Sequence, residues 1–256
     1  MTDRKKKYFT HVIDQLALEY NAKPENFTVE GLTFTLPAKP EGVRLYSHDI
    51  PFFAMATTGN SVVVTADERL HEPIKAIAGK EDHLFRLFEF KSLDSINELL
   101  KEYGYALFGT SHMYLPGNKK VNIELPESFE YKWFENESDI ASEFYPNKQF
   151  FMALSEEYNA DRPDVIAFAA YDGDKIAAVA GASADTAKMW QVGIDVLPEY
   201  RSHGLGAALV ANLCRRIEEK GHIPFYGAAV SNIHSQSIAV RCGFYPAWTE
   251  VITYKL

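Results

Sequence analysis

An arginine and two closely spaced glycines stand at the start of a predicted helix. Arg201 precedes Gly204 and Gly206 in the segment YRSHGLGAAL, and leucines at four-residue spacing predict a helix from Leu205. The first N–H groups of a helix have no backbone partner and carry a partial positive charge, so they attract phosphates. Glycine lets the backbone approach such a ligand closely and adopt turn geometry. The pattern therefore indicates a pyrophosphate-binding turn, with Arg201 adding charge at its entrance.

Two better-known phosphate-binding turns do not match these residues. A P-loop has Lys and then Ser or Thr after its last glycine, whereas Gly206 is followed by Ala207 and Ala208. The dinucleotide-binding fingerprint has a third glycine or alanine where this sequence has Leu209. A lone Gly-x-Gly pair is equally explained by tight packing of a helix on a strand, so the assignment depends on the rest of the chain.

The elements around this turn favour an α/β fold. The strand-like run MWQVGIDV ends just before it, and the helix that follows is closed by Gly221. Upstream, VIAFAAYDGDKIAAVAGASA predicts a hairpin around Asp172-Gly173. Residues 138–158 are expected to be mainly helical with a break at Pro146. The remaining candidates are the strands FEYKWFE, IPFYGAAV and EVITYKL and the short helix SQSIAVRCGF.

The first half of the chain is predicted to form a smaller α/β domain of its own. RKKKYFTHVIDQLALEY places its large apolar residues on one helical face, and PFFAMATTGNSVVVTA predicts a hairpin. Two helical patterns that end in glycine follow, and then a short strand over residues 105–108. Turn-forming residues gather between 116 and 128, so we expect domains at 1–127 and 128–256.

Composition and residue spacing argue against several classes of function. The 256 residues carry a net charge of −9, which disfavours a general nucleic-acid binder. Cys214 and Cys242 lack metal or redox spacing and the histidines form no ligand pair, so no metal is expected. No signal peptide or apolar run of membrane length is visible, which favours a cytoplasmic protein with no membrane partner.

Three motifs in the second half resemble the GNAT superfamily of acyl-CoA-dependent N-acyltransferases. The run from Arg201 to Gly206 is similar to the family's Arg/Gln-x-x-Gly-x-Gly/Ala motif, and the strand VGIDVLPEY before it is typical of the family. Asn232, Ser235 and Gly243-Phe244 resemble the later N-x-x-S…G-F pattern. These features stand in the family's order and spacing across residues 129–256. More loosely, the first half resembles the leading half of zwittermicin-resistance-type acetyltransferases.

The resemblance implies a mixed sheet whose central strands splay apart, with acetyl-CoA as the acyl donor in the gap. The backbone around Ile194 and Val196 would pair with the pantetheine arm of the donor. Asn232 and Ser235 would steady the far side of this arm, although they can also be interpreted as a cap of the following helix. The pyrophosphate would be held at Arg201, His203, Gly204, Leu205, Gly206 and Ala207.

Acetyl transfer to an amine requires a neutral amine, stabilisation of an oxyanion and a proton for the departing thiolate. A backbone N–H near Val196 would stabilise the oxyanion. Asp195 would take the proton of the ammonium, directly or through water. If Ile194 and Val196 face one side of the strand, Asp195 faces the other. A surface or salt-bridged Asp195 is therefore the alternative.

The family's usual general acid is missing from this sequence. That acid is a tyrosine seven residues after the asparagine, and Ala239 stands there. Ser235, one helical turn earlier on the same face, is nearest by spacing, whereas Ser237, Tyr226 and Tyr245 are less constrained alternatives. A thiol has an ordinary pKa of roughly 8.5, so a thiolate leaves tolerably well without an acid. The missing hydroxyl slows transfer without forbidding it.

The combined pattern predicts an N-acetyltransferase that moves an acetyl group from acetyl-CoA to a primary amine of a small molecule by direct attack. One alternative, which Ala239 favours, is a non-catalytic acyl-CoA-binding or sensor protein. Another is a transferase that modifies protein N-termini or lysines. The acid-rich composition suits a cationic acceptor. Residues 1–127 contain no second Arg-x-x-Gly-x-Gly motif and are expected to close the acceptor side of the site.

Overall fold

The computed structural model describes residues 3–44, 50–146 and 148–256. Its contacts define two compact units. The C-terminal unit consists of residues 3–5, 114–228 and 232–245, and the N-terminal unit of residues 6–113, 229–231 and 246–256. The chain passes between the units after residues 5, 113, 228, 231 and 245. This grouping differs from a single cut at residue 127 because the end of the last strand pairs within the N-terminal unit.

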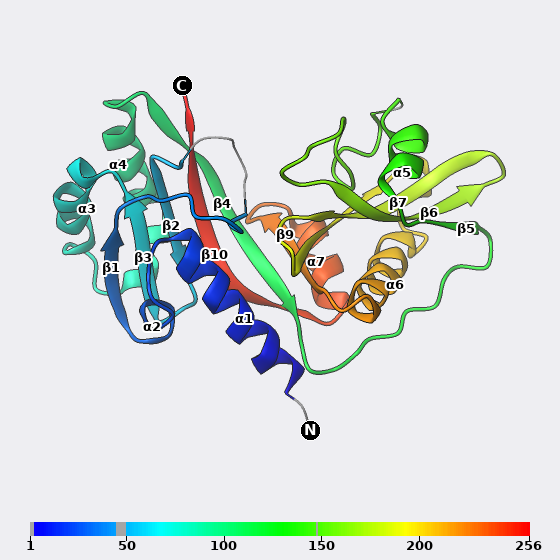
Figure 1. The fold of residues 1–256 in the computed structure, drawn as a ribbon, viewed down its shortest axis with the longest axis horizontal. Helices are drawn as coiled ribbons and strands as arrows, with labels where there is room; N and C mark the ends of the chain where they lie inside the picture. The colour runs from blue at the N-terminus through cyan, green and yellow to red at the C-terminus, as the bar shows by residue number, and fades with distance from the viewer. Residues whose placement is uncertain (1–2, 45–49, 147) are drawn as a thin grey trace. The chain divides into compact units, whose positions relative to one another are not determined.

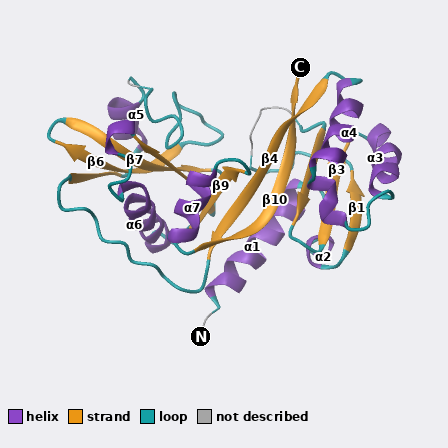
Figure 2. Cartoon of the chain, turned by 180° about the vertical axis from the view of Figure 1, so that it is seen from behind, coloured by secondary structure: helices purple, strands orange, loops and turns teal. Residues whose placement is uncertain are grey.

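The N-terminal unit is a sheet with helices on both faces. Its strands follow the order β1-β3-β2-β10-β4, in which β2 and β3 form the predicted antiparallel hairpin and β1 runs parallel to β3. Figure 1 shows α1 across one face of these strands, and Figure 2 shows α3 and α4 across the other. The elements are α1 (Arg4–Glu19), α2 (Glu25–Thr28), β1 (Gly31–Thr35), β2 (Phe53–Thr57), β3 (Ser61–Ala66), α3 (His71–Ala78), α4 (Phe90–Lys101), β4 (Tyr105–Pro116) and β10 (Phe244–Lys255), with short 3₁₀ helices at Glu68–Leu70 and Leu84–Phe88.

Alternation along the hairpin builds the core beneath α3 and α4. Phe53 and Met55 of β2 pack with Val64 of β3 against buried residues of the two helices, among them Ile74 and Ile96. Successive strand residues point to opposite faces of a sheet, which explains why every second residue of the hairpin joins this core. The predicted apolar face of α1 is also buried, with Ile13 and Leu16 inside.

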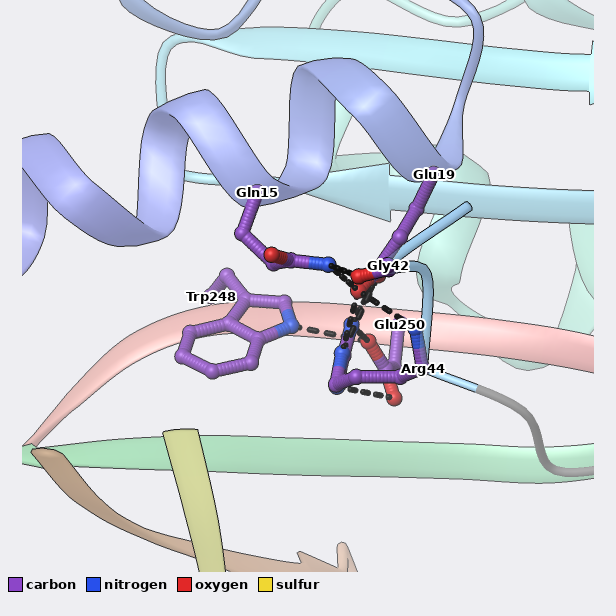
Figure 3. A network of polar contacts seen from close by, with 6 residues as sticks. All are labelled: Gln15, Glu19, Gly42, Arg44, Trp248 and Glu250. Atoms are coloured by element: carbon purple, nitrogen blue, oxygen red, sulfur yellow. Dashed lines mark hydrogen bonds and ion pairs between the residues drawn. The ribbon is translucent and has the colours of Figure 1, made fainter. Parts of the chain in front are cut away.

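A buried ion-pair network ties α1 to β10 inside the N-terminal unit (Figure 3). The Arg44 side chain is 1% exposed, and its Nη2 lies 2.6 Å from Oε2 of Glu19 and 3.0 Å from Oε2 of Glu250. Trp248 Nε1 donates to the same Glu250 oxygen at 2.8 Å. Gln15 and the backbone N–H of Arg44 donate to Glu19. Buried charges are costly unless they are paired and hydrogen-bonded, and here each charge is both.

The C-terminal unit is the mixed sheet that the sequence predicted. Its strands follow the order β9-β8-β7-β6-β5, with antiparallel neighbours from β5 to β8 and a parallel pair at β8 and β9. Figures 1 and 2 both show α5 on one face of this sheet and α6 on the other. The elements are β5 (Glu130–Phe134), α5 (Glu137–Phe144), β6 (Asp164–Asp172), β7 (Lys175–Ala184), β8 (Met189–Val196), α6 (Leu205–Glu219), β9 (Ile223–Ala229) and α7 (Ile233–Arg241), with a 3₁₀ helix at Pro198–Tyr200.

The two faces of this sheet have separate cores. Ala167 and Val179 pack with Phe144 beneath α5, whereas Phe168 and Ala180 pack with helix α6 on the opposite face. The expected α/β fold of the C-terminal half is therefore confirmed, together with an α/β N-terminal part. No helix in the described parts of the chain is long and apolar enough to cross a membrane.

One predicted element is wrong in part. Residues 138–158 were expected to be mainly helical, and α5 ends at Phe144. Residues 148–158 form turns and irregular backbone. Their backbone N–H groups are bonded partly by carboxylates outside the segment, which replaces the bonds a helix would supply.

Candidate functional site

The strands β8 and β9 pair along only part of their length. Their parallel register runs from Met189 with Ile223 to Val192 with Tyr226. β8 then continues to Val196 and β9 to Ala229. Over residues 193–196, β8 keeps its antiparallel bonds to β7 but has no register with β9 in the described pairing. The splay of the central strands is therefore present: beyond Val192, β8 has no β9 partner in the described pairing.

The α6 helix begins with an open N-terminus next to this splay. Its N-cap is Gly204, which has no side chain to cap the first turn. The first helical bond runs from the Ala208 N–H to the Gly204 carbonyl at 3.2 Å. The N–H groups of Leu205, Gly206 and Ala207 precede this bond, so they are the groups an anion would meet.

The two glycines of the turn serve different purposes. Gly204 has φ 82°, a left-handed conformation that favours glycine, and Ser202 before it has φ 68°. Gly206 is in the helix, and a methyl group at its Cα would lie 3.1 Å from Cδ1 of Ile238 and 3.6 Å from Cγ2 of Val196. Gly204 therefore shapes the turn, whereas Gly206 allows α6 to pack closely on β8 and α7.

The basic residues of the motif are bonded to the turn itself. Nε of Arg201 donates to the carbonyl oxygen of Val196 at 3.2 Å, which fixes the guanidinium over the end of β8. His203 Nδ1 lies 2.9 Å from the Arg201 carbonyl oxygen, and its ring contacts Phe129 with centroids 6.4 Å apart. Both side chains are exposed beside the helix N-terminus, where they add positive potential or donors for an anion.

Strand alternation places Asp195 opposite its neighbours, as expected. Ile194 and Val196 pack into the core beneath α6, whereas Oδ2 of Asp195 accepts the backbone N–H groups of Met152 at 2.7 Å and Ala153 at 3.1 Å. Burial raises the pKa of the Asp195 carboxyl, while these two hydrogen bonds and the charge of Arg201 act to lower it. Both of these hydrogen bonds go to Oδ2, and no described residue donates one to Oδ1. One carboxylate oxygen is therefore available for a proton.

The asparagine and serine of the later motif lie at the start of α7. Asn232 is the N-cap, and its side chain accepts the backbone N–H of Ser235 at 3.1 Å. The interpretation as a helix cap is therefore confirmed for Asn232, while Ser235 takes part through its backbone alone. The Ser235 side chain lies close enough to the Tyr226 hydroxyl to influence its pKa.

The structure separates the candidates for the general acid. Burial raises the pKa of Tyr226 to about 12, against the lowering effect of the nearby Ser235 side chain. Tyr226 is also the last β9 residue paired with β8, so its backbone stands where the strands part. Ser237 donates its hydroxyl to the Ile233 carbonyl within α7. Ala239 is fully buried in the core, so a tyrosine there would have to displace core side chains.

Two glycines that sequence reasoning did not single out shape the site. Gly181 of β7 and Gly193 of β8 are direct partners in register. A methyl group on Gly193 would lie 2.2 Å from the Met152 carbonyl oxygen, and one on Gly181 would lie 2.5 Å from that of Ala153. A glycine inside a strand often marks the close approach of another backbone, and that signal was present in the sequence.

The second half of the chain is similar to a known protein family. Residues 128–244 match the model of the acetyltransferase (GNAT) family. The match covers the parted strands, the glycine turn at α6 and the cap of α7. No curated protein is similar enough in sequence to match.

Several solved structures resemble the chain in fold. A GCN5-related N-acetyltransferase-like protein from Streptococcus suis 89/1591 is 18% identical, with a TM-score of 0.46 over 68% of this chain and 75% of that one. An acetyltransferase of the GNAT family from Colwellia psychrerythraea is 13% identical, with a TM-score of 0.44 over 82% of this chain and 84% of that one. A GCN5-related N-acetyltransferase from Sphaerobacter thermophilus is 15% identical, with a TM-score of 0.46 over 64% of this chain and 57% of that one.

Proposed function

We propose that this protein is an N-acetyltransferase that moves an acetyl group from acetyl-CoA to a primary amine of a small molecule by direct attack. The observation that carries the proposal is the parting of β8 from β9 beside an uncapped helix N-terminus. An extended acyl-CoA has an arm that can add to a strand edge and a pyrophosphate that suits helix N–H groups. Both binding elements lie within one unit of the fold.

Different residues bind different parts of the acyl donor in this proposal. Ile194 and Val196 offer backbone groups to the pantetheine arm, since β8 lacks its β9 partner there. The turn from His203 through Gly204 to Ala207 receives the pyrophosphate, with Arg201 at its entrance. Asn232 and Ser235 at the start of α7 line the other side of the arm. The donor supplies a thioester carbonyl as the electrophile, and no metal is part of the proposal.

Strand β8 supplies both the proton acceptor and the N–H group that stabilises the oxyanion. Asp195 takes a proton from the acceptor ammonium, and burial makes its carboxylate a stronger base than an exposed aspartate. The amine nitrogen then bonds to the carbonyl carbon, and the Val196 N–H stabilises the oxygen. The carbon–sulfur bond breaks as the sulfur takes a proton from Ser235 or from water. The new amide nitrogen loses its remaining extra proton to solvent, and solvent restores the Ser235 hydroxyl.

Within the family, we place the chain beside the zwittermicin-resistance-type acetyltransferases, on the likeness of its first half. The expected contribution of residues 1–127 to the acceptor side stays a prediction. The alternative of a non-catalytic acyl-CoA-binding protein is favoured by Ala239, because the usual acid is replaced by a buried methyl group. A transferase acting on protein amines is the other alternative.

A titration followed by an acceptor screen tests the proposal. Calorimetry of the full chain with acetyl-CoA should show saturable binding, and free CoA should then be released in the presence of at least one small primary amine. Binding without release for any amine or peptide favours the sensor alternative. Release with peptides alone favours the protein transferase. Absence of binding would overturn the whole assignment.

A further inference from the structure

The segment Phe150–Leu154 lies on β8 where that strand loses its partner. Gly193 is the first β8 residue beyond the last pair with β9, and its Cα faces the Met152 carbonyl oxygen at close range. Two residues further along, Asp195 accepts the Met152 N–H at 2.7 Å. Met152 is therefore held by its N–H group on Asp195, with its carbonyl oxygen packed against Gly193 where the strands part.

Side chains of this segment point in two directions. Phe150, Ala153 and Leu154 are buried in the core beneath α5. Phe151 and Met152 are 58% and 63% exposed. Isolated exposed apolar residues are common, but two large neighbours beside a site of group transfer mark a binding surface.

The backbone is held so that these two side chains stay in place. Asp195 holds the N–H groups of Met152 and Ala153, and Asp164 accepts the Ser155 N–H at 2.8 Å. Asp164 also accepts the Tyr145 hydroxyl at 3.1 Å. A surface that is ordered before binding loses less entropy when a ligand docks on it.

The charges of the segment favour a positively charged ligand. Residues 148–158 carry three exposed charged side chains, Lys148, Glu156 and Glu157, so carboxylates outnumber cations there. Asp195 adds a third carboxylate at the strand. This arrangement attracts an ammonium group and repels an acceptor that also carries a carboxylate.

We propose that the acceptor is a primary amine carrying an alkyl or aryl group and no carboxylate, with its ammonium at Asp195 and its apolar group on Phe151 and Met152. This inference rests on the proposed function and names its substrate class. Phe151 and Met152 are specificity-determining residues in this arrangement, since the apolar group contacts them while the nitrogen reacts.

The first test uses the wild-type full chain and a series of amines at saturating acetyl-CoA. For ethylamine, butylamine and hexylamine, kcat/KM should rise about two- to fourfold per added methylene, as expected for apolar burial. Phenethylamine should also be a better acceptor than ethylamine. Amino acids of matching length should be poor acceptors. A flat series, or a preference for the amino acids, would overturn the inference.

The second test uses Phe151→Ala and Met152→Ala, with Val29→Ala as the control because Val29 is also 63% exposed and lies in the N-terminal unit. The two site variants should lower kcat/KM for hexylamine about tenfold through KM and that for ethylamine by a clearly smaller factor, and the control should change neither. An unchanged hexylamine-to-ethylamine ratio in both site variants would overturn the inference alone. If acetyl-CoA binds and no amine or peptide reacts, the transferase proposal falls and this inference with it.

Discussion

Gly193 of β8 lies directly beneath the carbonyl oxygen of Met152, so close that a methyl group on its Cα would be 2.2 Å from that oxygen. The contact joins a segment that sequence periodicity assigned to a helix to the strand at which the sheet opens. It also explains why a strand otherwise rich in large side chains has a glycine at this point. The β-carbon is excluded by another backbone.

Replacing this glycine should loosen the segment. Gly193→Ala cannot be relieved by a side-chain rotation, because the clash is with backbone, and we expect a loss of about 1–3 kcal/mol in the free energy of unfolding. Turnover should fall as well, since Asp195 and Met152 would shift together. Urea denaturation measures the first effect and steady-state kinetics the second.

Gly79→Ala is the matched control, because Gly79 has φ −67° and a methyl group there would meet the Lys75 carbonyl oxygen only at 3.4 Å. It should be neutral or slightly stabilising. Equal stability of the two variants would contradict the close approach at Gly193.

Local spacing predicted the parts of the site that depend on the nearby chain. The glycine turn, the strand before it and the asparagine cap each lie within a few residues of one another, so their types and offsets carry the geometry. The Phe150–Leu154 segment was misassigned because the N–H groups of Met152 and Ala153 bond to Asp195, and that of Ser155 just beyond it bonds to Asp164, partners 42 or 43 and 9 positions away. No local pattern contains those partners.

The charge of the glycine turn can be tested without changing its shape. Asn and Asp both tolerate the left-handed conformation of Gly204 better than other side chains do. Gly204→Asn should bind acetyl-CoA with modestly reduced affinity. Gly204→Asp should bind about 5–30-fold more weakly than Gly204→Asn, because its carboxylate repels the pyrophosphate by about 1–2 kcal/mol at an exposed site. Calorimetry at two salt concentrations measures both; equal affinities would show that the pyrophosphate lies elsewhere.

The proposed base has a distinct pH signature. A carboxylate must be deprotonated to accept a proton, so kcat/KM should fall as the pH drops through the pKa of Asp195. Burial raises that pKa, and this acid limb should therefore lie above the value of about 3.9 for an ordinary aspartate. Asp195→Asn should abolish the limb and lower turnover about 10²–10⁴-fold. Its amide oxygen can still accept the N–H groups of residues 152 and 153, so the fold should persist. An acid limb that survives in Asp195→Asn would assign the base to another residue.

The buried network of Figure 3 should behave as a unit in stability measurements. Arg44→Met leaves the carboxylates of Glu19 and Glu250 buried without their cation, and should cost about 3–5 kcal/mol. Adding Glu250→Gln to Arg44→Met removes one uncompensated charge and should recover part of that loss. Thermal melts and urea titrations of the wild type and the two variants measure these differences in stability. A double variant no more stable than Arg44→Met would indicate that charge is not the source of the cost.

Ser235 and Tyr226 are the proposed source of the proton for the leaving thiolate. Because Asn232 caps α7 through the backbone N–H of Ser235, Ser235→Ala keeps the cap and should leave stability nearly unchanged. Tyr226→Phe removes the hydroxyl beside Ser235. If the two hydroxyls form one donor chain, each single variant should lower kcat, by up to about 10²–10⁴-fold, and leave KM for acetyl-CoA unchanged.

The double variant should then be no slower than the slower single variant, since either change breaks the same chain. Asn232→Ala provides the stability control and should cost about 1 kcal/mol through the lost cap. With the pKa of Tyr226 raised to about 12, the pair stays protonated at neutral pH, so no basic limb from it should appear below about pH 10. Wild-type kcat in both Ser235→Ala and Tyr226→Phe would assign the proton to solvent.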